Sequence, residues 1–240
     1  MNTARGSTVL FVHGGHHAGW CWLLVMERLA KCGIRSHAID LPFTAYEDDV
    51  VCVRTAIATA RTAGPVHVVC HSYAGLPVSE GGHAADHLTY VAARLPLPGE
   101  SPGSITDRWG FAKFRACVQR DRDGVTRLRP AARGHLYNRT DPTIAAFAMD
   151  RLRPMASEVP NDPVGEPAWT SVPTSYVVCG DDRAVRPSAQ RRRAALVTTS
   201  VELDTDHSPF FSDPSALAAF IGDQHERMVA MSDVRRGDKL

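Results

Sequence analysis

A serine stands at the end of an apolar segment in the first third of the chain. Residues 66–75 read VHVVCHSYAG, so a run typical of a buried strand leads into Ser72, and a helical pattern begins directly after it. A serine on such a tight strand-to-helix turn presents its hydroxyl as a nucleophile, and the cramped turn requires small neighbours. Cys70 and Ala74 are small but replace the usual glycines, and a serine here could also be an ordinary helix cap. The residues predict Ser72 as the nucleophile of an acyl-transfer reaction, provided that its partners exist elsewhere.

An acid and a base follow two later strands, in the order that this chemistry needs. In SYVVCGDDRAV, at 175–185, an apolar run leads to Asp181 and Asp182, and His207 lies in VELDTDHSP, at 201–209, just after the last expected strand. A histidine takes the proton of a serine efficiently when a carboxylate orients its ring. We predict His207 as the general base and Asp182 as the orienting acid, with Asp181 as the alternative.

The loop after the first strand is rich in glycine and histidine. It reads VHGGHH at 12–17, where a backbone N–H could help to stabilise the charge that develops on a carbonyl oxygen. Each such donor is worth about 3–4 kcal/mol in the transition state. We predict Gly15 as one donor and the residue after the nucleophile, Tyr73, as the other; the alternative is that the two glycines only form a turn. The histidines also raise the question of a metal, but no carboxylate lies at ligand spacing, so neither a metal nor another cofactor is expected.

Short apolar runs alternate with longer amphipathic stretches over most of the chain, which is typical of a mainly parallel sheet flanked by helices. Strands are expected at 8–12, 35–39, 66–70, 88–92, 175–179 and 200–203, and helices at 20–31, 48–62, 73–84, 187–197 and 214–227. Between residues 96 and 171 prolines interrupt the alternation, and a structureless loop of that length is rare. Residues 96–171 are therefore predicted to form a cap subdomain over a core of residues 1–95 and 172–227, with a C-terminal tail at 228–240. His16, Trp109 and Phe111 are candidates for the wall of the substrate pocket.

Composition excludes several classes of protein. The chain has 240 residues, 44% of them hydrophobic, and a net charge of +1, which fits one globular domain and gives no indication of nucleic-acid binding. The six cysteines form no CxxC pair, and no apolar run approaches the ~20 residues of a membrane span. We expect a cytoplasmic protein whose partner is a small-molecule ester and not a membrane; the oligomeric state is not indicated. His225, in the last expected helix, is assigned to the surface.

Four segments together resemble a known family. VHGGHHAGWCW, CHSYAG, WTSVPTSYVVCGDDRAV and VELDTDHSPFFSDPSALAAFI are similar to the bacterial relatives of the plant methylesterase and hydroxynitrile lyase group, within the α/β-hydrolase superfamily. The likeness covers nearly the whole chain outside residues 96–171. It implies an α/β-hydrolase fold with about six strands in a mainly parallel sheet, and a cap inserted after the fourth of these strands. It also favours Asp182 over Asp181, and it supports Gly15 and Tyr73 as oxyanion donors.

Two departures from the group bear on the reaction. Hydroxynitrile lyases that use a threonine in the first loop and a lysine after the catalytic histidine would need them at Gly14 and Ser208. Their absence favours a carboxylesterase-like enzyme that cleaves a small, largely apolar ester through an acyl-enzyme on Ser72. Two alternatives stay open: a lyase or cyclase/lactonase that acts on a natural product with the same triad, and a ligand-binding receptor built on this fold.

Overall fold

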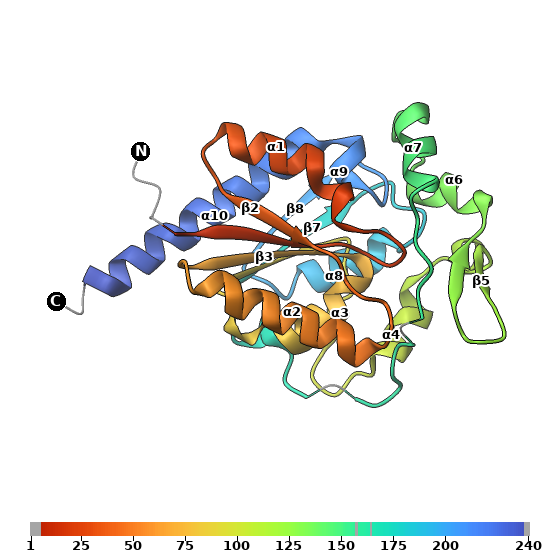
Figure 1. The fold of residues 1–240 in the computed structure, drawn as a ribbon, viewed down its shortest axis with the longest axis horizontal. Coiled ribbons are helices and arrows are strands. Elements are labelled where there is room, and N and C mark those ends of the chain that lie inside the picture. The colour runs from red at the N-terminus through yellow and green to blue at the C-terminus, as the bar shows by residue number, and fades with distance from the viewer. Residues whose placement is uncertain (1–5, 157, 164, 238–240) are drawn as a thin grey trace.

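The computed structural model describes residues 6–156, 158–163 and 165–237. Its centre is a parallel sheet of six strands in the spatial order β2-β1-β3-β4-β7-β8 (Figure 1). The four inner strands are mostly apolar, whereas the edge strands β2 and β8 also carry polar side chains, and each strand begins and ends within one residue of the position predicted. They are β1 (Thr8–Val12), β2 (Ser36–Ile39), β3 (Val66–His71), β4 (His87–Val91), β7 (Thr174–Cys179) and β8 (Thr199–Leu203).

Alternating side chains along the strands feed two separate cores. In β1, Leu10 and Val12 enter the core on one face of the sheet, whereas Val9 and Phe11 enter the core on the other. The first core lies under α2 (Tyr46–Arg61), α3 (Gly75–Gly81) and α8 (Pro187–Ala194), and the second under α1 (Leu23–Lys31), α9 (Pro209–Ser212) and α10 (Pro214–Gly237) (Figure 1). The short 3-10 turns η1 (Gly19–Trp22), η2 (Ser72–Ala74) and η3 (Gly82–Ala84) flank α1 and α3. The sheet is thus covered on both faces, as the sequence predicted.

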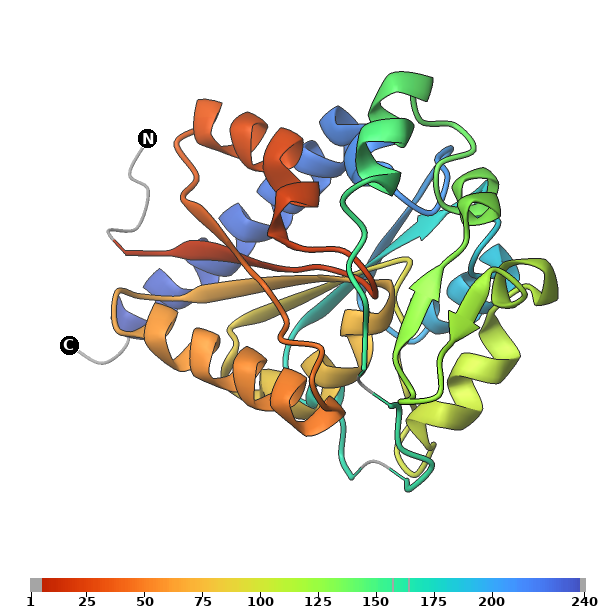
Figure 2. The ribbon, with the colours of Figure 1, turned by 45° about the vertical axis from the view of Figure 1, so that its right-hand side comes forward.

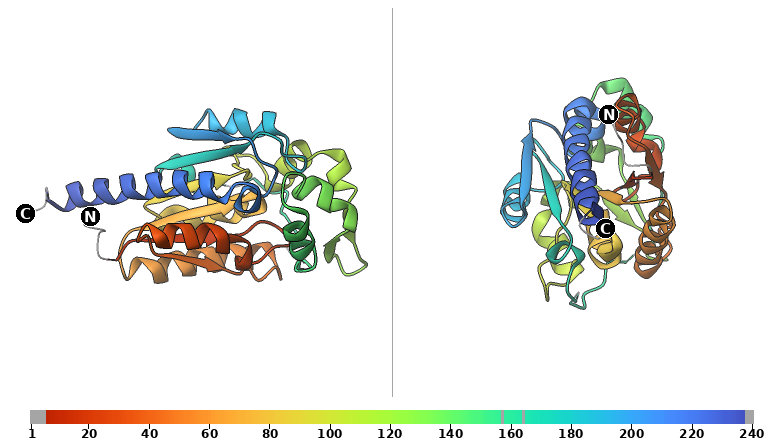
Figure 3. Two further views of the ribbon diagram at one scale, coloured as in Figure 1. Left: turned by 90° about the horizontal axis from the view of Figure 1, so that it is seen from above. Right: turned by 90° about the vertical axis from the view of Figure 1, so that its left-hand side faces the viewer.

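The last helix differs most from expectation. α10 continues ten residues beyond 227 to Gly237, through most of the segment expected to be a tail, and Figure 3 shows its end projecting past the sheet. Met228 is 4% exposed, so apolar packing continues beyond the predicted end. The prediction of a surface position for His225 is wrong: it is 4% exposed, and its Nε2 lies 3.2 Å from Ser7 Oγ. Despite its length α10 is too polar to span a membrane, and none of the other helices in the described part of the chain meets that requirement either.

The insertion between β4 and β7 contains its own secondary structure beside the carboxyl ends of the strands (Figure 2). Two of its helices begin at prolines that interrupt the sequence pattern. In each, the residue before the proline is the cap: Ser101 Oγ and Asp141 Oδ1 accept hydrogen bonds from backbone N–H groups of the first turn. A small core that includes Leu136 and Tyr137 joins several segments. The elements are α4 (Pro102–Trp109), α5 (Ala112–Arg115), β5 (Val118–Arg120), β6 (Thr126–Leu128), η4 (Pro130–Ala132), α6 (Arg133–Leu136), α7 (Pro142–Met149) and η5 (Ala168–Thr170).

Candidate active site

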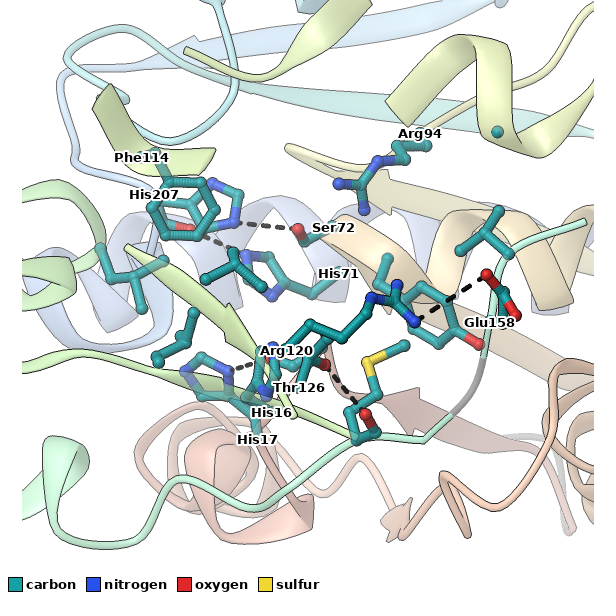
Figure 4. A pocket seen from close by; sticks show the side chains of 18 of the residues that line it. His16, His17, His71, Ser72, Arg94, Phe114, Arg120, Thr126, Glu158 and His207 are labelled. Carbon is teal, nitrogen blue, oxygen red and sulfur yellow. Dashed lines mark hydrogen bonds and ion pairs between the residues drawn. The ribbon is translucent and has the colours of Figure 1, made fainter. Parts of the chain in front are cut away.

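The three residues predicted to act together come from three different strands. Ser72 directly follows β3, Asp182 follows β7 and His207 follows β8. Because all these strands are parallel, their carboxyl ends lie at the same edge of the sheet, where ligands bind in open α/β folds. Residues after β1 and β3 and residues of the insertion enclose a cavity of about 420 Å³ at this edge (Figure 4).

A chain of hydrogen bonds connects these three side chains. Ser72 Oγ lies 2.9 Å from His207 Nε2, and His207 Nδ1 lies 2.7 Å from Asp182 Oδ2. Asp182 and His207 are each 2% exposed. An ionised carboxylate only accepts hydrogen bonds, so Nδ1 of the imidazole donates to it and Nε2 is left as the acceptor for the serine hydroxyl. This arrangement can remove a proton from Ser72 and hold the histidine in the required tautomer.

Asp182 is held by three further donors. Its Oδ1 accepts from the backbone N–H groups of Ala184 at 2.7 Å and Val185 at 2.8 Å, and its Oδ2 also accepts from Gln190 Nε2 at 2.7 Å. Gln190 is fully buried on α8, and its Oε1 accepts from Cys179 N at 2.9 Å. The glutamine therefore links the end of β7 to the carboxylate. Sequence reasoning missed it, because a glutamine in a helix carries no motif of its own.

The neighbouring carboxylate, Asp181, has other partners. Its Oδ2 accepts from Asn138 Nδ2 at 3.0 Å, and its side chain faces Arg139 at 3.5 Å and Arg183 at 3.6 Å. The structure thus brings Asp182 to the histidine ring, whereas Asp181 connects the core to the insertion.

A buried aspartate holds the loop that carries the histidine. Asp206 is fully buried, and its two oxygens accept four hydrogen bonds, two from its own loop and two from the insertion. The donors, at 2.8–2.9 Å, are Ser208 N, Ser212 Oγ, Arg139 N and Thr140 Oγ1. These four bonds fix the backbone on both sides of His207. Sequence reasoning missed this role, because two of the donors belong to the insertion and one of them lies 67 residues away.

The turn at Ser72 has the strained backbone expected of a nucleophile. Ser72 has a φ of +52°, a conformation that costs a residue other than glycine about 1–2 kcal/mol. Cys70 and Ala74, the two small replacements, are fully buried. The position that cannot accept a side chain is Gly75, where a Cβ would lie 2.1 Å from the carbonyl oxygen of Arg94. Gly75 therefore allows the turn to pack against the segment that follows β4.

The first loop lies directly against this turn. A Cβ at Gly14 would be only 2.5 Å from Nδ1 of His71, and the His71 ring is fixed because its Nε2 donates to the backbone oxygen of His207 at 2.8 Å. Gly15 and Tyr73, the two residues predicted to supply the oxyanion donors, both line the cavity beside Ser72. Tyr73 is anchored in turn, since its hydroxyl donates to the buried carboxylate of Asp49 at 2.6 Å.

Two histidines of the first loop are structural. His13 Nδ1 donates to the Gly14 carbonyl and its Nε2 accepts from the backbone of Leu41, while His17 Nδ1 donates to the Gly15 carbonyl and its Nε2 accepts from a tyrosine hydroxyl. Burial lowers the pKa of His13 to about 4 and that of His17 to about 3, so both rings are neutral at pH 7. Across the described residues no group of three or more histidine, cysteine or acidic side chains is arranged to hold a metal ion.

The predicted pocket wall needs correction at two of its three positions. His16 lines the cavity, with its Nδ1 donating to the carbonyl of Arg153. Trp109 and Phe111 do not line it: Trp109 is 4% exposed in the core of the sheet, and Phe111 lies under the guanidinium of Arg186. Both belong to the segment around α4, which the sequence placed over the site as a whole. The apolar lining includes Phe114, Val118, Leu128, Leu136 and Met155, farther along the insertion.

Comparison with known proteins gives the same architecture. Residues 9–220 match the alpha/beta hydrolase family. The chain is 25% identical to the alpha/beta hydrolase nvfD of Aspergillus novofumigatus, over 89% of this chain and 94% of that protein. It is 26% identical to Methylesterase 18 of Arabidopsis thaliana, over 88% and 94% of the two chains. The crystal structure of polyneuridine aldehyde esterase is similar with a TM-score of 0.78 at 16% identity, over 90% of this chain and 98% of that one.

Proposed function

Because the chain belongs to the alpha/beta hydrolase family and is carboxylesterase-like, we propose that it cleaves a carboxylic ester of a small, largely apolar molecule through an acyl-enzyme on Ser72. The observation that carries the proposal is the continuous hydrogen bonding from Ser72 Oγ through His207 to Asp182. The esterase names of several relatives support the same reaction class.

The proposed reaction starts from the hydrogen bond between Ser72 and His207. His207 Nε2 takes the proton of Ser72 as Oγ attacks the ester carbonyl, and the backbone N–H groups of Gly15 and Tyr73 stabilise the oxyanion. The protonated histidine then gives its proton to the leaving alcohol. Water activated by the same nitrogen releases the acid and restores the serine. Asp182 holds the ring in one tautomer throughout, and the insertion acts as a cap that supplies most of the apolar wall.

The two departures from hydroxynitrile lyases have a physical counterpart. No side chain fits at Gly14, because its Cβ would lie 2.5 Å from a ring nitrogen of His71. Ser208, at the position of the lysine, is fully buried and bears no charge. The site therefore lacks the threonine of the first loop and the lysine after the catalytic histidine, and this supports hydrolysis.

A fluorophosphonate probe tests the nucleophile. We expect the wild type to be labelled stoichiometrically and Ser72→Ala not to be labelled. Ser208→Ala is the matched control, since it removes another buried hydroxyl beside the site and should retain labelling. Labelling of Ser72→Ala at the rate of the wild type would exclude Ser72 as the nucleophile.

Mass spectrometry tests the acyl-enzyme. Rapid acid quenching during turnover of a 4-nitrophenyl ester should trap an adduct with the mass of the acyl group on the peptide that contains Ser72. A panel of aryl, alkyl and methyl esters and lactones then defines the substrate. Turnover of a natural product with no adduct at any quench time would reject the acyl-enzyme and favour a lyase or cyclase.

A further inference from the structure

A partly buried cationic side chain, that of Arg94, lies beside the nucleophile. Arg94 follows β4 by three residues, and its backbone N–H donates to the carbonyl of Ser72 at 3.0 Å. Its guanidinium lines the same cavity as Ser72 and points into it (Figure 4). The backbone at Arg94 packs tightly against the turn that carries the nucleophile, because Gly75 lies directly against the Arg94 carbonyl. Arg94 therefore has a fixed position at the reaction centre.

The Arg94 side chain is partly buried and has few partners among the described residues. Its Nε is buried without a hydrogen-bond partner, and within the described residues no carboxylate forms an ion pair with its guanidinium. Burial lowers the pKa of Arg94 to about 10, so the group still carries its charge at neutral pH. A partly buried charge whose Nε is buried and unpaired is costly, and proteins keep such groups where a ligand completes the pairing.

The other charged groups near the cavity are already engaged. Asp182 accepts from His207 and Gln190, as described above. Arg120 is 52% exposed and lies 3.8 Å from Glu158, which is 81% exposed, so this pair is largely screened by solvent. Arg94 is thus the cation with the least compensation in the lining of the cavity.

We propose that Arg94 binds a free carboxylate of the substrate, so that the ester cleaved at Ser72 is a monoester of a dicarboxylic acid. A carboxylate is ionised at neutral pH and can accept two parallel hydrogen bonds from the planar guanidinium. The remainder of the molecule faces the apolar lining of the insertion, which includes Phe114, Leu136 and Met155. This inference rests on the proposed esterase function and narrows its substrate class.

The placement of His207 indicates which part of the ester carries the carboxylate. In Figure 4, His207 and Arg94 lie on different sides of Ser72. His207 must protonate the leaving alcohol, so the alcohol part points toward the histidine. The acyl part then extends toward Arg94, which assigns the second carboxylate to the acid that is released. Water adds to the ester bond, and the products are a dicarboxylate and an alcohol.

Matched esters test this substrate class. Monomethyl glutarate and dimethyl glutarate differ by a single charge, and 4-nitrophenyl butyrate is a neutral reference ester. We expect the wild type to have a higher kcat/KM for the monoester than for the diester. Arg94→Gln should lower kcat/KM for the monoester by roughly 10- to 150-fold, which is the loss expected when a hydrogen bond to a charged group is removed. For the neutral esters kcat/KM should change by less than about threefold. Arg94→Lys keeps the charge but not the planar pair of donors, so its kcat/KM for the monoester should lie between those of the wild type and Arg94→Gln.

Two control variants and a stability measurement separate recognition from folding. Arg186→Gln, an exposed arginine outside the cavity lining, should preserve the ratio between the two glutarate esters. Arg94→Gln should unfold at the same temperature as the wild type or a higher one, because it removes a partly buried charge that has no ion pair among the described residues. Equal losses on the charged and neutral esters, or loss of the preference in Arg120→Gln instead, would overturn the proposal.

A binding measurement distinguishes failure of this proposal from failure of the esterase function. Calorimetry of monomethyl glutarate with Ser72→Ala and with Ser72→Ala/Arg94→Gln requires no turnover. Binding by the first and not the second supports the carboxylate site even if no ester is cleaved. Fluorophosphonate labelling and turnover of 4-nitrophenyl butyrate, without any Arg94-dependent binding or preference, would leave the esterase function intact and refute the role of Arg94.

Discussion

Replacing Asp182 by asparagine removes one charge at the centre of the hydrogen-bond chain with almost no change in shape. Asp182 accepts four hydrogen bonds, two at Oδ1 from backbone N–H groups and two at Oδ2, from His207 Nδ1 and Gln190 Nε2, each at 2.7 Å. An asparagine oxygen can keep the first pair. Its NH₂ group then faces two donors, and the imidazole must carry its proton on Nε2 to avoid the clash. In that tautomer it cannot accept the proton of Ser72.

The expected effect follows from this reversal of the tautomer. In serine proteases the same change lowers kcat by about 10⁴-fold, or about 5 kcal/mol, and the equivalent geometry here should give a loss of at least about 10³-fold at pH 7. Loss of the charge-assisted bond from Gln190 should also lower the free energy of unfolding by about 1.5–3 kcal/mol. Hydrolysis of 4-nitrophenyl butyrate measures the first quantity, and urea unfolding measures the second.

Asp181→Asn is the matched control for this experiment. Asp181 is 33% exposed at its side chain and pairs with the insertion, so its replacement should change kcat less than about threefold. An Asp182→Asn enzyme within tenfold of the wild type, or a larger loss in Asp181→Asn, would refute the assignment of the acid and the tautomer argument with it.

Further predictions concern stability and local packing. Burial lowers the pKa of His87 and His225 to about 4. Below pH ~6.5 the unfolded chain binds protons that these folded rings reject, so the free energy of unfolding should fall between pH 6.5 and 4 by up to about 1.4 kcal/mol per pH unit for each histidine. Urea unfolding at several pH values should show that the free energy of unfolding depends less steeply on pH in the variant His87→Gln/His225→Gln. An unchanged pH dependence would contradict the lowered pKa values of these two histidines. The free energy of unfolding of Ser72→Gly should be about 1 kcal/mol higher than that of Ser72→Ala, because glycine tolerates the positive φ. Equal stabilities would argue against strain at the turn. Gly14→Ala should lower kcat by roughly 10- to 100-fold, since its Cβ displaces the ring that holds the catalytic histidine, and wild-type kcat would show that the loop can yield.

The sequence could predict the elements that depend on local pattern. The inner strands of the sheet are mostly apolar runs that end in turns, and all six strands lie within one residue of their predicted bounds. The residues after those runs, Ser72, Asp182 and His207, could be grouped because parallel strands bring their carboxyl ends to one edge. Where two acids stand side by side, only the resemblance to a family distinguished them before the geometry did. The last helix extends farther than its pattern suggested: Met228 is still buried, and the end of the helix projects past the sheet.

Other features were decided by tertiary structure alone. Asp206 bonds to residues of the insertion as far as 67 positions away, and Gln190 reaches Asp182 only because α8 folds back beside the end of β7; no sequence motif encodes either pair. The same applies to Arg94, whose sequence context is only the end of a strand. The role proposed for Arg94 depends on the cavity that its side chain enters, and on the absence of a counter-charge among the described residues there. The spacing of apolar residues in the sequence indicates which face of a helix or strand is buried. Which side chains face each other across a cavity depends on how the folded elements pack.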